Sequence, residues 1–126
     1  DARSALAWLR VRYPDFPYAL AGFSFGSRVI TRLGCEVGRE AGGASFLMSA
    51  GFPTRWGSPD YLDRCPPRKI FIQSTNDSYG PRAELEAIYQ RLAAPKELHW
   101  IAAADHFFAG GLEALEEQVM LAADIE

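Results

Sequence analysis

The stretch that most constrains the fold of this chain is Gly22-Phe23-Ser24-Phe25-Gly26, because it joins two segments of different character. An apolar run over residues 18–21 precedes it, and apolar residues at helical spacing follow it, at Val29, Ile30, Leu33 and Val37. A serine at so tight a strand-to-helix junction is held in a strained backbone conformation with its hydroxyl at the tip. Glycine is expected at both flanking positions, since a Cβ there would collide with the neighbouring strand or helix.

The same five residues also have an ordinary interpretation, a glycine-rich turn whose serine takes no part in chemistry. The bare spacing of glycine and serine would arise by chance in roughly one such sequence in twenty, so it needs support from elsewhere in the chain. A helix that begins directly after Ser24 would favour negative charge beside the hydroxyl, through its free N–H groups and its dipole. The residues that follow in the chain have to decide between the two interpretations.

Helical and extended patterns alternate along the rest of the chain. Helices are predicted over residues 2–12, from the junction to about Glu40, from Pro81 until Pro95, and around Leu112 to Val119. Ala41-Gly42-Gly43 is expected to end the second of these helices. A further short helix is predicted over residues 59–64. Strands are predicted over 18–23, 44–50, 69–73 and 97–101. This order predicts an α/β fold, a mostly parallel sheet of about four strands with flanking helices, in a single domain over residues 1–126.

Three side chains with complementary chemistry are expected at one edge of this sheet. Ser24, Asp77 and His106 each follow a predicted strand, and the carboxyl ends of parallel strands meet at the same edge. A serine hydroxyl needs a base within hydrogen-bond reach, and the imidazole needs a carboxylate that fixes its tautomer. We therefore interpret Ser24 as nucleophile, His106 as general base and then acid, and Asp77 as the residue that orients it.

Other interpretations of these residues are open at this point. Asp77 lies in Thr75-Asn76-Asp77-Ser78, which is a typical turn, and His106 could be a structural loop residue. Asp105 is a rival carboxylate, but a sequence neighbour of His106 rarely reaches its ring, so Asp105 fits a turn better. His99 lies within a predicted strand, which favours a packed or surface residue over a base. Ser27 is interpreted as a small surface or packing residue.

Three segments in order resemble the carboxyl-terminal half of an α/β-hydrolase. They are Ala21-Gly22-Phe23-Ser24-Phe25-Gly26, Ser74-Thr75-Asn76-Asp77 and Ala104-Asp105-His106-Phe107-Phe108, and the resemblance extends from Ala2 to about Val119. It is nearest to small dienelactone-hydrolase-like and esterase-like bacterial members, although dienelactone hydrolases proper have Cys where this chain has Ser24. The resemblance implies hydrolysis of esters or related acyl compounds through an acyl-enzyme, with no metal and no organic cofactor.

The resemblance also implies parts that this chain lacks. The sheet of the family has about eight strands, whereas only the last four are recognised here, and the loop that normally supplies the second oxyanion N–H is missing. The strand at 18–23 would then be an open apolar edge, which invites pairing with another chain. The chain also begins at Asp1 without Met. We expect either a piece of a longer protein or a homo-oligomer that covers this edge.

Aromatic residues gather in the segments around the predicted site. The backbone N–H of Phe25 is the expected oxyanion donor. The side chains expected near a substrate pocket are those of Phe23, Phe25, Phe52, Trp56, Tyr79, Phe107 and Phe108. The alternative is that several of them pack in the core, above all Phe23 and Phe107. The loop 51–59 is too short for a domain-sized cap, so a small or exposed substrate is expected. Arg55 could bind an anion, although an ordinary surface arginine is the simpler interpretation.

Composition excludes several classes of partner. The net charge of −3 provides no basic surface for nucleic acid. No apolar run approaches the roughly 18 residues of a membrane span. Cys35 and Cys65 have no metal-site spacing and are interpreted as reduced thiols of a cytoplasmic protein, with a single disulfide as the alternative.

The sequence leaves two kinds of function in competition. The first is a serine hydrolase that cleaves small carboxylic esters, with a thioesterase or peptidase using the same three residues as a variant. The second is a weak or inactive α/β-hydrolase fragment that serves as an assembly or binding module. The intact set of Ser24, Asp77 and His106 favours the first, and the absent amino-terminal strands favour the second.

Overall fold

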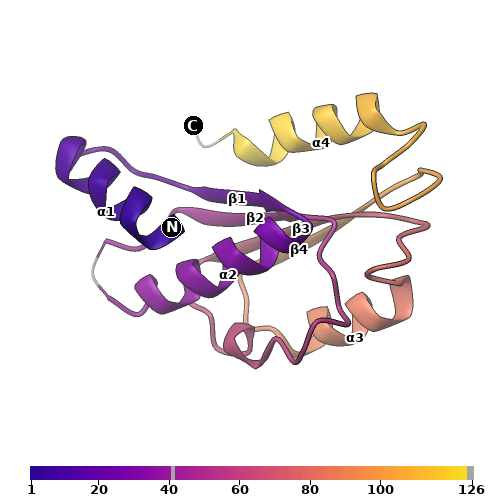
Figure 1. The fold of residues 1–126 in the computed structure, drawn as a ribbon, viewed down its shortest axis with the longest axis horizontal. Coiled ribbons are helices and arrows are strands. Elements are labelled where there is room, and N and C mark those ends of the chain that lie inside the picture. The colour runs from indigo at the N-terminus through magenta and orange to yellow at the C-terminus, as the bar shows by residue number, and fades with distance from the viewer. Residues whose placement is uncertain (41, 125–126) are drawn as a thin grey trace.

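The computed structural model describes residues 1–40 and 42–124. Its regular elements are α1 (Ala2–Arg12), β1 (Leu20–Phe23), α2 (Phe25–Val37), β2 (Phe46–Ala50), the 3₁₀ turn η1 (Asp60–Leu62), β3 (Arg68–Ser74), α3 (Arg82–Arg91), β4 (Lys96–Ile101) and α4 (Leu112–Ala123). Figure 1 shows them as a sheet with helices on both sides. The alternation of helices and strands expected from the sequence is confirmed.

The four strands form one parallel sheet in the order β1-β2-β3-β4. Each strand therefore lies beside the strand that follows it in the chain, and all four carboxyl ends meet at one edge. The register aligns Phe23 with Ala50, Ala50 with Ile72, and Ile72 with His99. The predicted α/β class is thus confirmed, and the loops after β1, β3 and β4 emerge on the same side of the molecule.

The two central strands, β2 and β3, are buried on both faces, as expected for apolar strands of a parallel sheet, whereas β1 and β4 are only partly buried. One face packs under α2 and α3, where the buried core includes Leu47, Phe52, Leu62, Phe71 and Leu85. The other face packs under α4, where the core includes Met48, Ile70, Ile72, Phe108 and Ala122. Figure 1 shows α4 on one side of the sheet and α2 and α3 on the other. This sandwich holds the strand ends, and the loops that leave them, in fixed positions.

The ends of the helices differ slightly from the prediction. α2 ends at Val37 and not at Glu40, with Gly38 as its C-cap. A Cβ on Gly38 would lie 2.7 Å from Cδ of Pro67, so glycine is required where the helix ends. Of the predicted stop Ala41-Gly42-Gly43, Gly42 and Gly43 lie in the loop after the helix, and Ala41 lies outside the described residues. Pro81 is the cap that precedes α3 and not its first helical residue.

The two cysteines are joined, so the interpretation as reduced thiols is wrong. Cys35 of α2 and Cys65, in the segment before β3, form a disulfide, and both residues are fully buried. The sequence could not show this, because the two segments come together only when α2 packs on the sheet. Disulfides persist mainly in oxidising compartments. The two cysteines therefore no longer support the prediction of a cytoplasmic location.

The strand β1 lies at the edge of the sheet, where Ala21 and Phe23 are exposed. Beside its amino-terminal end, α1 and the segment before β1 enclose an apolar hollow of about 400 Å³. Its walls include Leu6, Leu9, Phe16, Leu20 and Leu33. The open edge predicted from the sequence is thus present among the described residues. No helix in the described part of the chain is long and apolar enough to cross a membrane.

Candidate active site

Ser24 lies between β1 and α2 with backbone angles that residues other than glycine rarely adopt, φ 55° and ψ −123°. Its N–H donates to the carbonyl of Ala50 on the neighbouring strand, at 2.9 Å. A Cβ on Gly22 would lie 2.5 Å from the carbonyl oxygen of Gly26, so glycine is required at position 22. A Cβ on Gly26 would meet no described atom within 4 Å, so the clash predicted at position 26 does not occur among the described residues.

His106 and Asp77 come from the loops after β4 and β3, which are neighbouring strands. Oδ2 of Asp77 lies 2.7 Å from Nδ1 of His106, and Nε2 of His106 lies 2.9 Å from Oγ of Ser24. A carboxylate can only accept, so Nδ1 carries the proton and Nε2 is free to accept from the serine hydroxyl. The structure thus brings together three side chains that lie far apart in the sequence. Such a relay can draw a proton from a hydroxyl.

Both oxygens of the Asp77 carboxylate accept hydrogen bonds. Oδ1 accepts the N–H groups of Tyr79 at 2.8 Å and of Gly80 at 2.9 Å, while Oδ2 accepts from His106. The side chain is fully buried. Asp77 therefore does form the turn that its sequence context suggests, and the same turn aims its second oxygen at the imidazole. The loop of Asp77 is also tied to the loop of His106, because Nδ2 of Asn76 donates to the carbonyl of Ala103.

The competing residues have other partners. Oδ1 of Asp105 accepts the N–H groups of Phe107 and Ala109, so Asp105 forms the turn that positions His106. Nε2 of His99 pairs with Oε1 of Glu97 at 3.0 Å, within β4. Ser27 is buried and its hydroxyl donates to the carbonyl of Ser24, so it packs under the turn.

Phe25, the first residue of α2, follows Ser24 directly. Within residues 1–40 and 42–124, no acceptor is found for its backbone N–H. The N-terminal N–H groups of a helix are free to bind an anion, and this one lies beside the serine hydroxyl. The position is geometrically suited to an oxyanion that forms on a carbonyl carbon bonded to Ser24. The described residues contain no cluster of three or more His, Cys, Asp or Glu side chains that could hold a metal ion.

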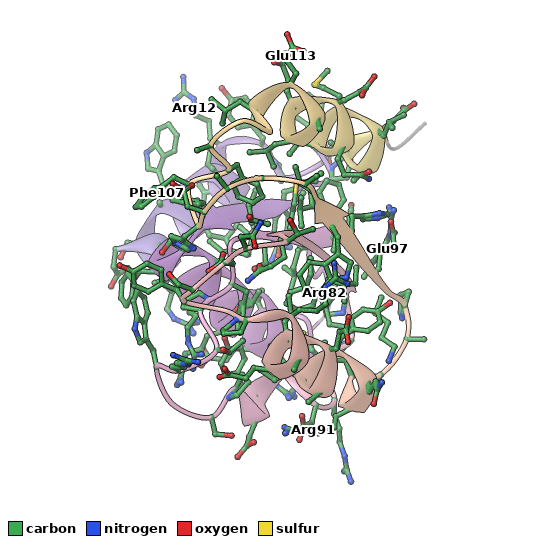
Figure 2. The ribbon with its side chains drawn as sticks, turned by 90° about the vertical axis from the view of Figure 1, so that its right-hand side faces the viewer. Arg12, Arg82, Arg91, Glu97, Phe107 and Glu113 are labelled. Carbon is green, nitrogen blue, oxygen red and sulfur yellow. A yellow bond between two sulfur atoms is a disulfide. The ribbon has the colours of Figure 1, made fainter. Side chains whose placement is uncertain are left out.

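Aromatic rings surround the imidazole of His106. Ring centroids lie 5.1 Å away for Phe23, 4.6 Å for Tyr79 and 5.2 Å for Phe107. Figure 2 shows the molecule from the carboxyl edge of the sheet, with Phe107 at the surface. Phe23 and Phe107 are 44% and 64% exposed, so neither is a core residue.

A second aromatic group lies along the loop after β2. The ring of Trp56 is 6.0 Å from that of Phe25 and 6.4 Å from that of Tyr79. The prediction for Phe52 needs correction, because its side chain is fully buried and packs edge-on against Phe71. The N–H of Phe52 donates to Oε1 of the buried Gln73 of β3 at 2.8 Å, which holds Phe52 in the interior. Its ring belongs to the core and offers no surface to a substrate.

The loop that carries Trp56 is held by two arginines. Arg55 forms an ion pair with Glu84 of α3 at the surface, as an ordinary surface arginine would. Hydrogen bonding from Arg55 lowers the pKa of the Glu84 carboxyl. Arg28 of α2 donates to two carbonyl groups of the loop, those of Pro53 and Gly57. The sequence analysis did not single out Arg28, since nothing in its local context separates it from other helical arginines.

Gly51 is a further residue of the site that the sequence analysis did not single out. It has φ +65°, and a Cβ there would lie 3.1 Å from both Cε1 of His106 and the ring of Phe23. An alanine there would be strained at this φ, and the imidazole or the ring of Phe23 would have to shift by a few tenths of an ångström. The available signal was a glycine directly after a strand, at the edge where ligands bind in such sheets.

Solved structures with the same fold identify the architecture. An alpha-beta serine hydrolase homologue from Coxiella burnetii has a TM-score of 0.85 at 23% identity, and a putative alpha/beta hydrolase of unknown function from Agrobacterium tumefaciens has 0.84 at 23%. Each match covers 98% of this chain and 57% of the other. A serine hydrolase without lid from Xanthomonas campestris has 0.78 at 27% identity, over 93% of this chain and 51% of that one.

The chain therefore has the fold of the α/β serine hydrolases, as the resemblance in sequence implied. It spans little more than half the length of these structures. No family model matches the chain, and no curated protein sequence matches it significantly.

Proposed function

We propose that this protein is a serine hydrolase that cleaves small carboxylic esters through an acyl-enzyme. The observation that carries the proposal is the continuous relay from Oγ of Ser24 through the imidazole of His106 to the carboxylate of Asp77, at 2.9 and 2.7 Å. Ser24 also has a strained backbone, at the edge of the sheet where such folds bind ligands.

The proposed reaction has two halves. Nε2 of His106 takes the hydroxyl proton while Oγ of Ser24 attacks the ester carbonyl carbon, and the carbonyl oxygen becomes an oxyanion beside the N–H of Phe25. His106 then gives the proton to the departing alkoxide, which leaves as the alcohol. In the second half His106 takes a proton from water while the water oxygen attacks the acyl carbon. The bond from that carbon to Oγ of Ser24 then breaks, His106 returns the proton to Oγ, and the acid departs. Asp77 stabilises the imidazolium in both halves, and no cofactor is needed.

The surroundings of Ser24 favour a small substrate at an open site. The loop 51–59 is short, and the rings of Phe25, Trp56, Tyr79 and Phe107 are all partly exposed. Exposed rings can hold an apolar acyl or aryl group without enclosing it. The similar protein from Xanthomonas campestris is described as lacking a lid, which is consistent with this proposal.

A fluorophosphonate probe tests the proposal directly, because it reacts only with an activated serine. We expect the probe to label Ser24 in the parent chain, and we expect Ser24→Ala to lose both labelling and the hydrolysis of 4-nitrophenyl acetate. Ser27→Ala is the control, since Ser27 is buried beneath the same turn. An unlabelled parent whose ester hydrolysis equals that of Ser24→Ala would end the enzyme proposal.

A second function is favoured by a different observation. The chain spans 57% of the Coxiella structure, and one oxyanion donor instead of two would cost on the order of a hundred- to a thousandfold in rate. The same fold could then act as an assembly or binding module with little hydrolysis. A thioesterase or peptidase would use the same three residues, so thioester and peptide substrates compared with esters separate these variants.

A further inference from the structure

Arg28 occupies a position in α2 one helical turn beyond Ser24 and is half-buried. Its Nη1 donates to the carbonyl of Pro53 at 2.8 Å, and its Nη2 donates to the carbonyl of Gly57 at 3.0 Å. The guanidinium also lies 5.2 Å from the ring centroid of Phe52. No carboxylate of the described residues lies within ion-pair distance of it. Its donors are therefore used to hold the loop after β2.

The two carbonyl groups bracket Trp56 in the sequence. Residues 51–59 contain no helix or strand. The first part of this loop is held by the N–H of Phe52 on Oε1 of Gln73 at 2.8 Å and by the N–H of Thr54 on the carbonyl of Tyr79 at 3.0 Å. Closer to Trp56 the other anchor is the exposed pair of Arg55 and Glu84, and exposed pairs stabilise weakly. The planar fork of Arg28 can reach both carbonyl groups at once, which the single ammonium of a lysine cannot do in the same geometry. Arg28 is therefore the residue that closes the loop around Trp56.

The aromatic rings of the site differ in whether they contact the imidazole. Among the described residues, Phe23, Tyr79 and Phe107 have ring contacts with His106, whereas Phe25 and Trp56 have none. The ring of Trp56 lies between the two groups, 6.0 Å from that of Phe25 and 6.4 Å from that of Tyr79. In the proposed reaction His106 hands its proton to the departing alcohol, so that alcohol lies on the side of the imidazole. The acyl group stays on Ser24 and lies toward Phe25 and Trp56.

We propose that Arg28 is a positioning residue that sets acyl specificity: it holds Trp56 against Phe25, so that the two rings bind a bulky apolar or aromatic acyl group. The inference rests on the proposed ester hydrolysis and deepens it by naming the substrate class. Arg28 does not contact the reacting atoms. Its loss therefore affects the binding of large acyl groups more than that of small ones.

The experiment compares 4-nitrophenyl phenylacetate with 4-nitrophenyl acetate, which differ only in the acyl group. We expect Arg28→Met to lower the ratio of the two kcat/KM values, phenylacetate over acetate, about tenfold, mainly through KM for phenylacetate. Arg28→Lys is expected to restore little of it. The matched control is Arg32→Met, one turn further along α2, whose guanidinium lies over the ring of Tyr61 and has no hydrogen bond to the described residues of the loop. An unchanged ratio in Arg28→Met, or an equal fall in Arg32→Met, would overturn the inference.

A second readout is independent of activity. Trypsin cleavage after Arg55, followed by mass spectrometry, reports how tightly the loop is held. Faster cleavage in Arg28→Met, with Arg32→Met equal to the parent, supports the anchoring role, and equal cleavage in all three contradicts it. If the parent hydrolyses neither ester, the proposed function fails and the acyl specificity fails with it. The cleavage rates still decide whether Arg28 anchors the loop.

Discussion

Single residues of the nucleophile turn carry different physical requirements, although they belong to one motif. Gly22 faces the carbonyl of Gly26 across a gap with no room for a methyl group, whereas Gly26 itself faces open space. Ser24 adopts a positive φ that only strong local packing maintains. At the scale of single residues, changes of a few tenths of an ångström in these contact distances alter the geometry of the site.

The two glycines provide a matched pair of substitutions. Gly22→Ala places a Cβ 2.5 Å from a backbone oxygen, so we expect it to lower the free energy of unfolding by about 1–3 kcal/mol and to displace Ser24. Gly26 lies in α2, where a Cβ would have no contact. We therefore expect Gly26→Ala to leave the free energy of unfolding unchanged or to raise it by up to about 1 kcal/mol. Urea denaturation of both variants measures the difference, and equal stabilities would contradict the argument.

Asp77 supports a prediction about charge. Asp77→Asn keeps the shape of the side chain, but the neutral amide no longer stabilises the imidazolium and no longer selects the tautomer with the proton on Nδ1. We expect kcat for ester hydrolysis to fall about 10⁴-fold with a nearly unchanged circular dichroism spectrum. Asp105→Asn is the comparison, because Asp105 accepts only backbone N–H groups. Similar losses in the two variants would argue against a special role for Asp77.

At the scale of the elements, α2 links the parts of the site. It begins at the nucleophile turn, carries Arg28 toward the Trp56 loop, and is joined through Cys35 to the segment before β3. Its inner side packs on β1 and β2 beneath the sheet. A helix anchored at several points along its length keeps the N–H of Phe25 aligned with Ser24.

The disulfide is expected to contribute measurably to stability. Cys35 and Cys65 are separated by 30 residues, and closing a loop of this length in the unfolded chain corresponds to about 3–4 kcal/mol. Adding dithiothreitol should therefore lower the urea midpoint of the parent chain. The double variant Cys35→Ala/Cys65→Ala should have the lower midpoint already and show no response to the reductant. A parent midpoint that ignores the reductant would contradict a stabilising disulfide.

At the scale of the whole molecule, the described residues leave the β1 edge of the sheet open. β1 pairs only with β2 among the described strands, and the apolar hollow of about 400 Å³ lies beside it. Backbone groups on an open edge pair readily with another strand. We propose that the edge is covered in the functional protein, either by a second copy or by further chain of the same protein.

Mass in solution tests this proposal. The chain alone, of 13.9 kDa, is expected to self-associate when measured by light scattering after size exclusion. Ala21→Lys places a charge on the exposed side of β1 and should reduce the association, since edge lysines oppose pairing. A soluble, stable monomer of the parent chain would contradict the proposal.

The sequence by itself determined the features that depend on local pattern. Periodicity placed the helices and strands, and the alternation of elements required a parallel sheet. Because the loops at the carboxyl ends of parallel strands share one edge, the sequence predicted that Ser24, Asp77 and His106 lie at that edge. These inferences succeed because a strand or helix is recognised from neighbouring residues, and because few topologies connect alternating elements.

Only the tertiary structure decided the features that depend on which distant segments touch. The pairing of Cys35 with Cys65, the burial of Phe52 and the reach of Arg28 to the Trp56 loop all require the position of α2 on the sheet. Gly51 matters only because His106 arrives opposite it. The physical reason is that burial and hydrogen bonding across the chain are set by packing, and the local sequence around each partner carries no record of the other.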